Sequence, residues 1–211
     1  MELQDDEMQN LITAVMLRNP KARHNEIIGD IFLIKLFNKL EDARELSAKI
    51  NACSRFGEPT LALQLCLEMQ SAKKRAETIH AKYKQMLISG LRFAESTEKI
   101  TSKGLVIINA RSEIRETMIG TIASILSNSS IYEEGTIITT MAYYENRIKI
   151  SARNAGRFGR NLREVLNKVV EPMGGQVGGH HNAAGCIITQ DKEDEFIENL
   201  KKNLEIEMIK I

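Results

Sequence analysis

Apolar residues in the first part of the chain recur at the spacing of helices. A first helix is predicted before Pro20, because acidic residues lead into apolar positions that lie three and four residues apart. The apolar run 27–37 fits either a helix or a short strand. Gly57 and Pro59 break the pattern, and a helix is expected on either side of them. The first covers residues 40–52, with Ala43, Leu46 and Ile50 inward, and the second covers residues 60–69.

The longest amphipathic pattern covers residues 71–98. Ser71 is expected to cap this helix at its amino end, because its hydroxyl can accept a backbone hydrogen bond. One face carries a coiled-coil-like seam whose members are spaced alternately by three and four residues: Ala72, Ala76, Ile79, Tyr83, Met86, Gly90 and Phe93. Gly90 either weakens the helix or lets a neighbouring element approach closely.

After Gly104 the pattern alternates between strands and helices. Strands are predicted at 105–109, 135–142, 147–152, 186–189 and 206–211, and helices at 112–126, 160–170 and 193–203. This order is typical of an α+β fold with helices on one face of a mixed sheet. The change in pattern predicts two domains: residues 1–100 as a helical linker or interaction region, and residues 101–211 as a mixed β-sheet with helices packed on it.

The composition is that of a soluble globular protein, with 43% hydrophobic and 27% charged residues among 211. No apolar run is long enough to span a bilayer, and the acidic start does not resemble a signal peptide, so we expect no membrane contact. Cys53, Cys66 and Cys186 form neither a CxxC pair nor a disulfide framework, and we expect all three to be buried. A reducing cytoplasm is the expected location.

The net charge of +1 says little about a partner, but the distribution of charge says more. Residues 147–168 hold seven basic residues and a single acid, Glu164. A local basic stretch is typical of proteins that contact phosphate. A solvated helix face with lysines at a strand edge would explain the same charges equally well.

Residues 174–185 contain five glycines and two alanines. Such a segment leaves backbone N–H groups free to face an anion, because glycine tolerates positive φ and close backbone approach. Arg153 ends a predicted strand upstream, and its planar guanidinium matches the geometry of phosphate. Together these features predict a clamp for a phosphodiester. The alternative is that Arg153 pairs with a surface carboxylate and that the glycines form a tight turn.

The segment GGHHNAAG at 178–185 resembles the GGH-x-x-AAG signature of the DHH-associated domain. That domain is the substrate-binding half of RecJ-type exonucleases, oligoribonucleases, cyclic-dinucleotide phosphodiesterases and alanyl-tRNA-editing proteins. The strand bearing Ser151-Ala152-Arg153 is similar to the family's companion motif. Residues 42–46, 51–57 and 61–67 are similar to the segment that follows the catalytic domain in archaeal RecJ-like proteins, including the GINS-associated nuclease.

The resemblance implies contacts to a nucleotide phosphate or sugar from Arg153 and from residues of the glycine-rich segment: Gly178, Gly179, His180, His181, Asn182 and Gly185. It further implies contacts from Asn51 and Arg55 of the helical region. The family's DHH triplet and the aspartates and histidines that hold two Mn²⁺ or Mg²⁺ ions have no counterpart in this sequence. We therefore expect no catalytic residue, metal ligand or cofactor in this chain, and Mn or Mg only in a separate catalytic domain. His24 and His80 are isolated and expected on the surface.

Two functions fit these observations. In the first, the chain is the half of a RecJ-like DHH exonuclease or phosphoesterase that binds single-stranded DNA or RNA, without the metal-dependent catalytic domain. In the second, it is a non-catalytic, RecJ-related component of the archaeal replication complex of GINS and helicase. Recognition of small nucleotides or aminoacyl esters is a third reading. The expected partners are single-stranded nucleic acid, a DHH catalytic domain, replication proteins such as GINS, or a second copy of the chain.

Overall fold

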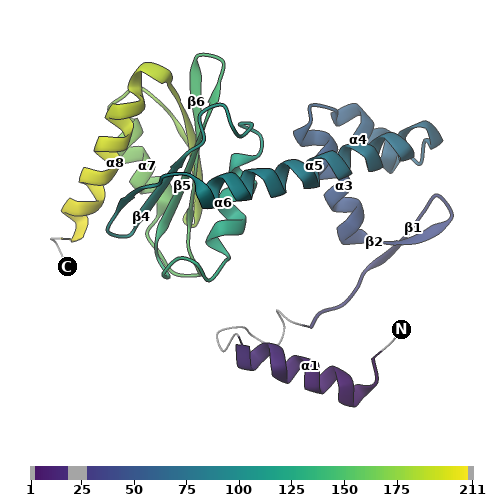
Figure 1. The fold of residues 1–211 in the computed structure, drawn as a ribbon. Coiled ribbons are helices and arrows are strands. Elements are labelled where there is room, and N and C mark those ends of the chain that lie inside the picture. The colour runs from purple at the N-terminus through teal and green to yellow at the C-terminus, as the bar shows by residue number, and fades with distance from the viewer. Residues whose placement is uncertain (1–2, 19–27, 209–211) are drawn as a thin grey trace.

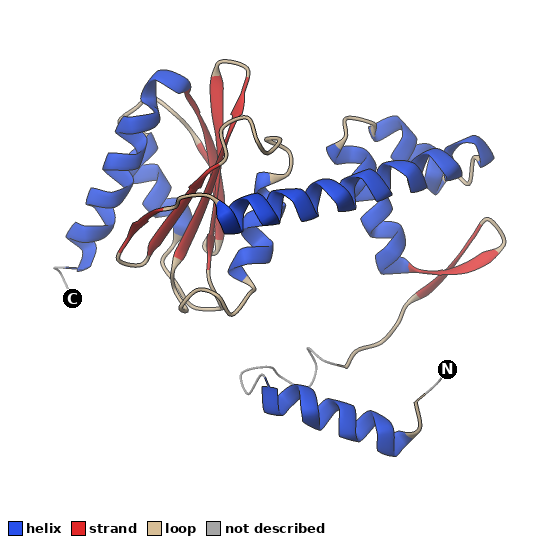
Figure 2. Ribbon diagram, in the orientation of Figure 1, coloured by secondary structure: helices blue, strands red, loops and turns tan. Residues whose placement is uncertain are grey.

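The computed structural model describes residues 3–18 and 28–208, and Figure 1 shows their arrangement. The predicted first helix is confirmed as α1 (Asp5–Arg18), none of whose residues is buried. A group of helices follows, and the longest of them, α5, leads to a β-sheet that is covered by helices (Figure 2). In the described ranges, no helix is long and apolar enough to cross a membrane.

A hairpin that the sequence did not predict precedes the helical group. Strands β1 (Leu33–Leu36) and β2 (Lys39–Asp42) pair antiparallel. Phe37 and Asn38 connect them with φ angles of 49° and 59°, both in the left-handed region that such a two-residue hairpin turn requires. The helix predicted from residue 40 therefore begins only at Ala43, where the Asp42 side chain caps it by accepting from the Arg44 amide at 2.8 Å.

Three helices form the helical group: α3 (Ala43–Arg55), α4 (Pro59–Cys66) and α5 (Gln70–Ser96). The predicted seam of α5 is confirmed, because its members are buried or half-buried. Gly90 lets α6 approach, since a Cβ at this position would lie 2.5 Å from the Ile122 Cδ1 atom. The prediction for Ser71 is wrong: Met69 caps α5, without a side-chain hydrogen bond. Cys66 is exposed rather than buried, because it ends α4 on the outer side.

The second part of the chain forms a six-stranded sheet in the order β3-β4-β5-β6-β8-β7. Only β4 and β5 run parallel, and the other neighbours are antiparallel. The predicted strands at 105–109, 135–142, 147–152 and 186–189 are confirmed within a few residues. The strands are β3 (Ile100–Ser102), β4 (Leu105–Asn109), β5 (Ile137–Tyr144), β6 (Arg147–Asn154), β7 (Val177–His180) and β8 (Ala183–Thr189).

Helices cover both faces of this sheet, not one as the sequence predicted (Figure 1). α6 (Ile119–Ser127) packs on one face, and α7 (Leu162–Val170) and α8 (Glu193–Met208) pack on the other. The physical reason lies in β4 and β5, whose consecutive residues are buried, so that each strand contributes apolar side chains to a core on either side. One core holds Val106, Ile108, Ile138 and Ala142, and the other holds Leu105, Ile107, Ile137 and Met141.

One predicted helix of this part is confirmed only over its second half, and one predicted strand is wrong. The helix expected at 112–126 begins only at Ile119, because Arg111 has a left-handed φ of 45° and its carbonyl accepts from the Tyr143 amide. The expected closing strand 206–211 is instead the end of α8 as far as Met208, and residues 209–211 lie outside the described residues. The core on the α6 face also takes in α3, α4 and α5, so apolar packing crosses residue 100, and the two-domain division stays a prediction.

His80 is buried in α5, with 7% of its surface exposed, so its predicted surface position is wrong. His24 lies outside the described residues. Burial, and then the charge of Lys84, lower the pKa of His80 below its ordinary value. A folded state that holds this imidazole neutral binds protons less well than the unfolded chain does. The free energy of unfolding is therefore unaffected by the titration of His80 above the pKa that this imidazole has in the unfolded chain. It decreases as the pH falls from there toward and through the lower pKa of the folded state.

We expect His80→Gln to reduce the dependence of stability on pH. The wild-type chain should lose more free energy of unfolding than the variant between about pH 7.5 and about pH 5.5, around the ordinary histidine pKa. Urea unfolding of both proteins across this range measures the difference. Parallel curves for the two proteins would show that His80 does not titrate differently in the folded state.

Candidate functional site

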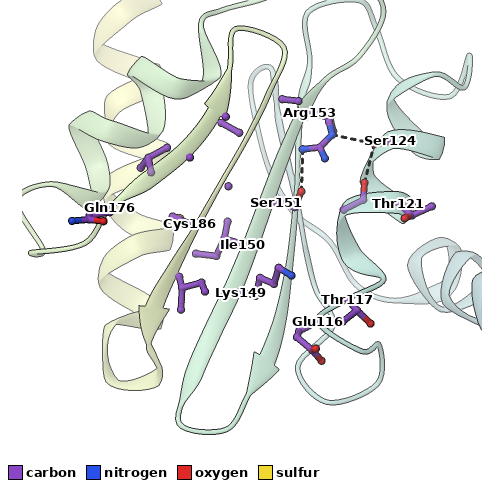
Figure 3. Close-up of a pocket in the computed structure, with 18 of the residues that line it drawn as sticks. Glu116, Thr117, Thr121, Ser124, Lys149, Ile150, Ser151, Arg153, Gln176 and Cys186 are labelled. Carbon is purple, nitrogen blue, oxygen red and sulfur yellow. Dashed lines mark hydrogen bonds between the residues drawn. The ribbon is translucent and has the colours of Figure 1, made fainter. Parts of the chain in front are cut away.

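An open groove of about 990 Å³ lies on the α6 face of the sheet (Figure 3). α6 packs over β5 and β6 and leaves β8 and β7 uncovered, and this gap becomes the floor of the groove. Side chains of β6 and α6 rise along one side, where Ser124, Ser151 and Arg153 point toward one another (Figure 3). The residues before α6 and the carboxyl end of α3 complete the groove with Thr117 and Arg55.

Strand alternation places small residues on the floor of the groove beside one large side chain, that of Ile187. Ala184, Cys186 and Ile188 of β8 point into the core under α7 and α8, so the residues between them face the groove. On the groove side of β8 lie Ala183, Gly185 and Ile187, and Gly178 lies beside Gly185 on β7. A Cβ on Gly178 would meet nothing within 4 Å. A ligand can therefore come close to the backbone of these strands.

The predicted glycine loop is thus a β-hairpin. Gly179 has a φ of 131°, and a Cβ there would lie 2.3 Å from the Ala183 carbonyl oxygen and 2.5 Å from the Ala184 Cα. At Gly185 a Cβ would lie 2.7 Å from the carbonyl oxygen of Ile150 on β6. These two glycines are required by close contact between strands, whereas Gly178 alone of the three opens onto free space.

Arg153 sits near the end of β6 and is held by hydroxyl and carbonyl groups. Its Nε donates to the Ser124 Oγ at 3.0 Å, and its Nη1 donates to the Ser151 Oγ at 3.0 Å and to the Ala152 carbonyl at 2.7 Å. No carboxylate of the described residues lies within ion-pair distance of it, so the alternative pairing with a surface acid is not found there. Burial, and then the nearby charge of Arg55, lower the pKa of the Arg153 guanidinium.

Two more cations line the groove. Lys149 lies on the same face of β6 as Arg153, and Arg55 donates from α3 to the Thr117 carbonyl at 2.7 Å. Glu116 supplies the only carboxylate in the lining. The Thr117 Oγ1 is buried and has no hydrogen-bond partner. The groove therefore has an excess of positive charge and an unused hydroxyl, which suits an anion that accepts hydrogen bonds.

The structure brings together some of the predicted site residues and not others. Arg153, Arg55, Gly178, Gly179 and Gly185 all line the groove. Asn51 is exposed one helical turn before Arg55 and does not line it.

His180, His181 and Asn182 form the exposed tip of the β7–β8 hairpin and do not line the groove either. The backbone carbonyl of His181 accepts from the Leu162 amide at 2.8 Å, and the Asn182 Oδ1 accepts from the Asn154 Nδ2 at 3.1 Å. These bonds tie the tip to α7 and β6. By alternation, His180 falls on the same face of β7 as Gly178.

Sequence reasoning missed several residues of the groove. Lys149 and Ser151 could have been found, because they alternate with Arg153 along one strand and so share its face. Ser124 and Thr117 gave no such signal, since their positions depend on how α6 and the residues before it lie against β6. Cys186 lies beneath the floor, and burial raises the pKa of its thiol to about 12, so it is no nucleophile.

The groove does not fit a two-metal hydrolytic centre. In the described parts of the chain, no three His, Cys, Asp or Glu side chains are close enough to share a metal ion. A two-metal centre needs several such ligands clustered around both ions, and the groove offers Glu116 as its one carboxylate and no histidine. The placement of Mn or Mg in a separate catalytic domain stays an expectation.

Residues 102–205 match the DHHA1 domain family. This part of the chain is a DHHA1 domain, the DHH-associated domain of the DHH phosphoesterase superfamily. An uncharacterized protein of Methanocaldococcus jannaschii is 30% identical over 205 residues, which cover 94% of this chain and 43% of that protein. The chain therefore spans less than half the length of this curated relative.

Solved structures share the fold. RecJ from Thermus thermophilus, in complex with Mg²⁺, matches 74% of this chain and 24% of its own with a TM-score of 0.59 and 20% identity. Exonuclease RecJ bound to manganese has a TM-score of 0.56 and 19% identity, and the match covers 74% of this chain and 39% of that one. The DHH domain of a member of the s1p family of ribosomal proteins has a TM-score of 0.51 and 16% identity, and the match covers 76% of this chain and 41% of that one. The chain has the fold of the DHH-associated part of RecJ-like proteins.

Gly179 and Gly178 should respond differently to substitution. Gly179→Ala places a Cβ against the Ala183 carbonyl at a φ that side chains rarely adopt, so we expect a loss of at least about 2 kcal/mol in free energy of unfolding. Gly178→Ala should leave stability within about 0.5 kcal/mol, as for an open site. Chemical unfolding of both variants tests this, and equal losses would mean that the hairpin is arranged differently.

Proposed function

We propose that this chain is the part of a RecJ-like DHH phosphoesterase that binds single-stranded nucleic acid, and that the groove holds its sugar-phosphate backbone. The observation that carries this proposal is the guanidinium of Arg153, which lines an open groove without a carboxylate partner among the described residues. A half-buried charge of this kind needs an anion to offset its desolvation.

The shape of the groove favours a backbone phosphate. Arg153 is held by Ser124 and Ser151, so its guanidinium is oriented before a ligand arrives. The floor at Gly178 and Gly185 carries no side chain that would keep a chain of nucleotides away. An open groove suits a polymer that enters and leaves at its ends, whereas a small nucleotide is usually enclosed.

Cleavage would then fall to a separate catalytic domain that supplies Mn or Mg, and this chain would supply affinity. The solved relatives named RecJ carry Mg²⁺ or manganese in their structures, and this chain matches 24% and 39% of their lengths.

A second function, as a non-catalytic component of a replication complex with GINS, is favoured by one observation. The outer side of the helical group exposes 61% of Leu63 and 66% of Leu67, and such apolar exposure is typical of contact with another protein. The same apolar surface would also suit contact with a DHH catalytic domain.

Arg153→Ala should weaken binding of single-stranded DNA or RNA by about 10- to 100-fold, the usual range for losing a charge-assisted contact of about 1–3 kcal/mol. The slope of log affinity against log salt should become shallower by about one, because one phosphate contact fewer releases fewer counterions. Arg153→Lys should recover only part of the loss, since an ammonium cannot make the paired contact. Fluorescence anisotropy at several salt concentrations measures both quantities.

Arg163→Ala is the matched control, because Arg163 lies exposed on α7 across the sheet and the same charge is removed. It should bind like the wild type. If Arg153→Ala binds with unchanged affinity and slope, while both variants melt normally, the groove does not hold the phosphate.

The isolated 211-residue chain should bind single strands without cutting them. The reason is its donor set, since the described residues bring no three metal-ligating side chains together. Labelled DNA and RNA incubated with the protein and Mn²⁺ provide the assay. Cleavage that scales with protein and stops with EDTA would contradict this expectation.

A further inference from the structure

A second hollow of about 320 Å³ lies just past the carboxyl end of α3. Arg55 lines the groove, and the next residue, Phe56, lines this second pocket. Arg75, Thr78 and Lys82 line it from α5, where their spacing of three and four residues places them on one helix face. The groove of the sheet and the pocket of the helical group are therefore lined by consecutive residues where α3 ends.

Side-chain contacts join the two hollows. The Tyr83 hydroxyl lies 3.3 Å from the Oγ1 of Thr121, a groove residue, and the Tyr83 ring packs edge-on against Phe56 at 6.5 Å between centroids. The guanidinium carbon of Arg115 lies 5.5 Å from the centre of the Phe56 ring. The segment 115–121 thus runs from the Phe56 ring to the groove, and it contacts the helical group through Arg115 and Thr121.

Positive charge continues along this route. Arg55, Arg115 and Lys82 have no carboxylate within ion-pair distance in the described parts of the chain. Arg75 is different, because its Nη2 contacts Glu58 Oε1 at 2.6 Å. Three uncompensated cations outside Arg153 and Lys149 exceed what one phosphate needs. An arginine stacked on an aromatic ring also offers a flat surface on which a base can stack.

We propose that the groove and the second pocket form one continuous track for a single strand. A strand held at Arg153 continues over Arg55 and the Phe56–Arg115 pair, and a further phosphate of the same strand contacts Lys82. This inference rests on the proposed function and narrows its ligand to polynucleotides longer than a dinucleotide. It also assigns the helical group a direct part in binding.

The test compares a 5′-phosphorylated dinucleotide with an oligonucleotide of about eight nucleotides, a length within the usual site size for single-strand binding. Calorimetry with the full 211-residue chain gives both affinities. Lys82→Ala and Arg115→Ala should each weaken the longer ligand by about 3- to 10-fold. Lys82→Ala should also make its salt slope shallower by about one, because it removes a phosphate contact. Both should leave the dinucleotide within about twofold of wild type, because it fills only the groove around Arg153.

Lys84→Ala is the matched control, since it removes the same charge from the same helix two residues further on, where a side chain faces another direction. It should leave the binding of both ligands unchanged. Longer-ligand affinity that survives in Lys82→Ala and Arg115→Ala would overturn the track. Equal affinity of the wild-type protein for the dinucleotide and the longer oligonucleotide would also overturn the track. If Arg153→Ala still weakened that binding, the proposed function would stand without the track. A wild-type chain that binds neither ligand would defeat both proposals.

Discussion

The charge of Arg153 is the constraint on which the arrangement of the groove depends. The guanidinium lies half-buried near the end of β6 and is held by Ser124, Ser151 and the Ala152 carbonyl rather than by an acid. Neutral partners orient this cation but leave its charge uncompensated, so the free energy of its desolvation is recovered only when an anion arrives. The remaining features of the groove serve the approach of that anion.

Each layer of the fold contributes to this arrangement. β6 carries Arg153, Ser151 and Lys149 on one face, while its alternate residues anchor the strand in the core under α7 and α8. α6 brings Ser124 to the guanidinium of Arg153 and does not cover β8 and β7. The glycines of these two strands leave their backbone open to a ligand. The helical group reaches the same place because Gly90 lets α5 and α6 pack closely and because Arg55 binds the Thr117 carbonyl.

Local patterns in the sequence predicted much of this fold. The α5 seam, the strands around β4 to β6 and the small-residue segment that contains Gly178 and Gly185 all depend on spacing along the chain. Their α+β class followed from the order of elements. The apolar residues on both sides of β4 and β5 also carried the signal for helices on both faces, although we predicted only one covered face.

Features that depend on contacts between distant elements could not be predicted in the same way. The β1–β2 turn needs left-handed φ at Phe37 and Asn38, and a phenylalanine gives no indication of that. Burial of His80 and exposure of Cys66 depend on how the helices pack against one another. Ser124 joins Arg153 across 29 positions of the chain, a pairing that only the packing of α6 on β6 brings about.

The most direct test of the account follows the ligand's contacts by NMR. Isotope-labelled chain is titrated with a single-stranded oligonucleotide, and the Nε–H signal of Arg153 is observed together with the amide signals of Gly178 and Gly185. The account predicts that these three signals shift together and saturate at one ligand concentration, because one phosphate backbone lies against all of them. Signals that stay in place while residues of α7 or α8 shift would contradict it.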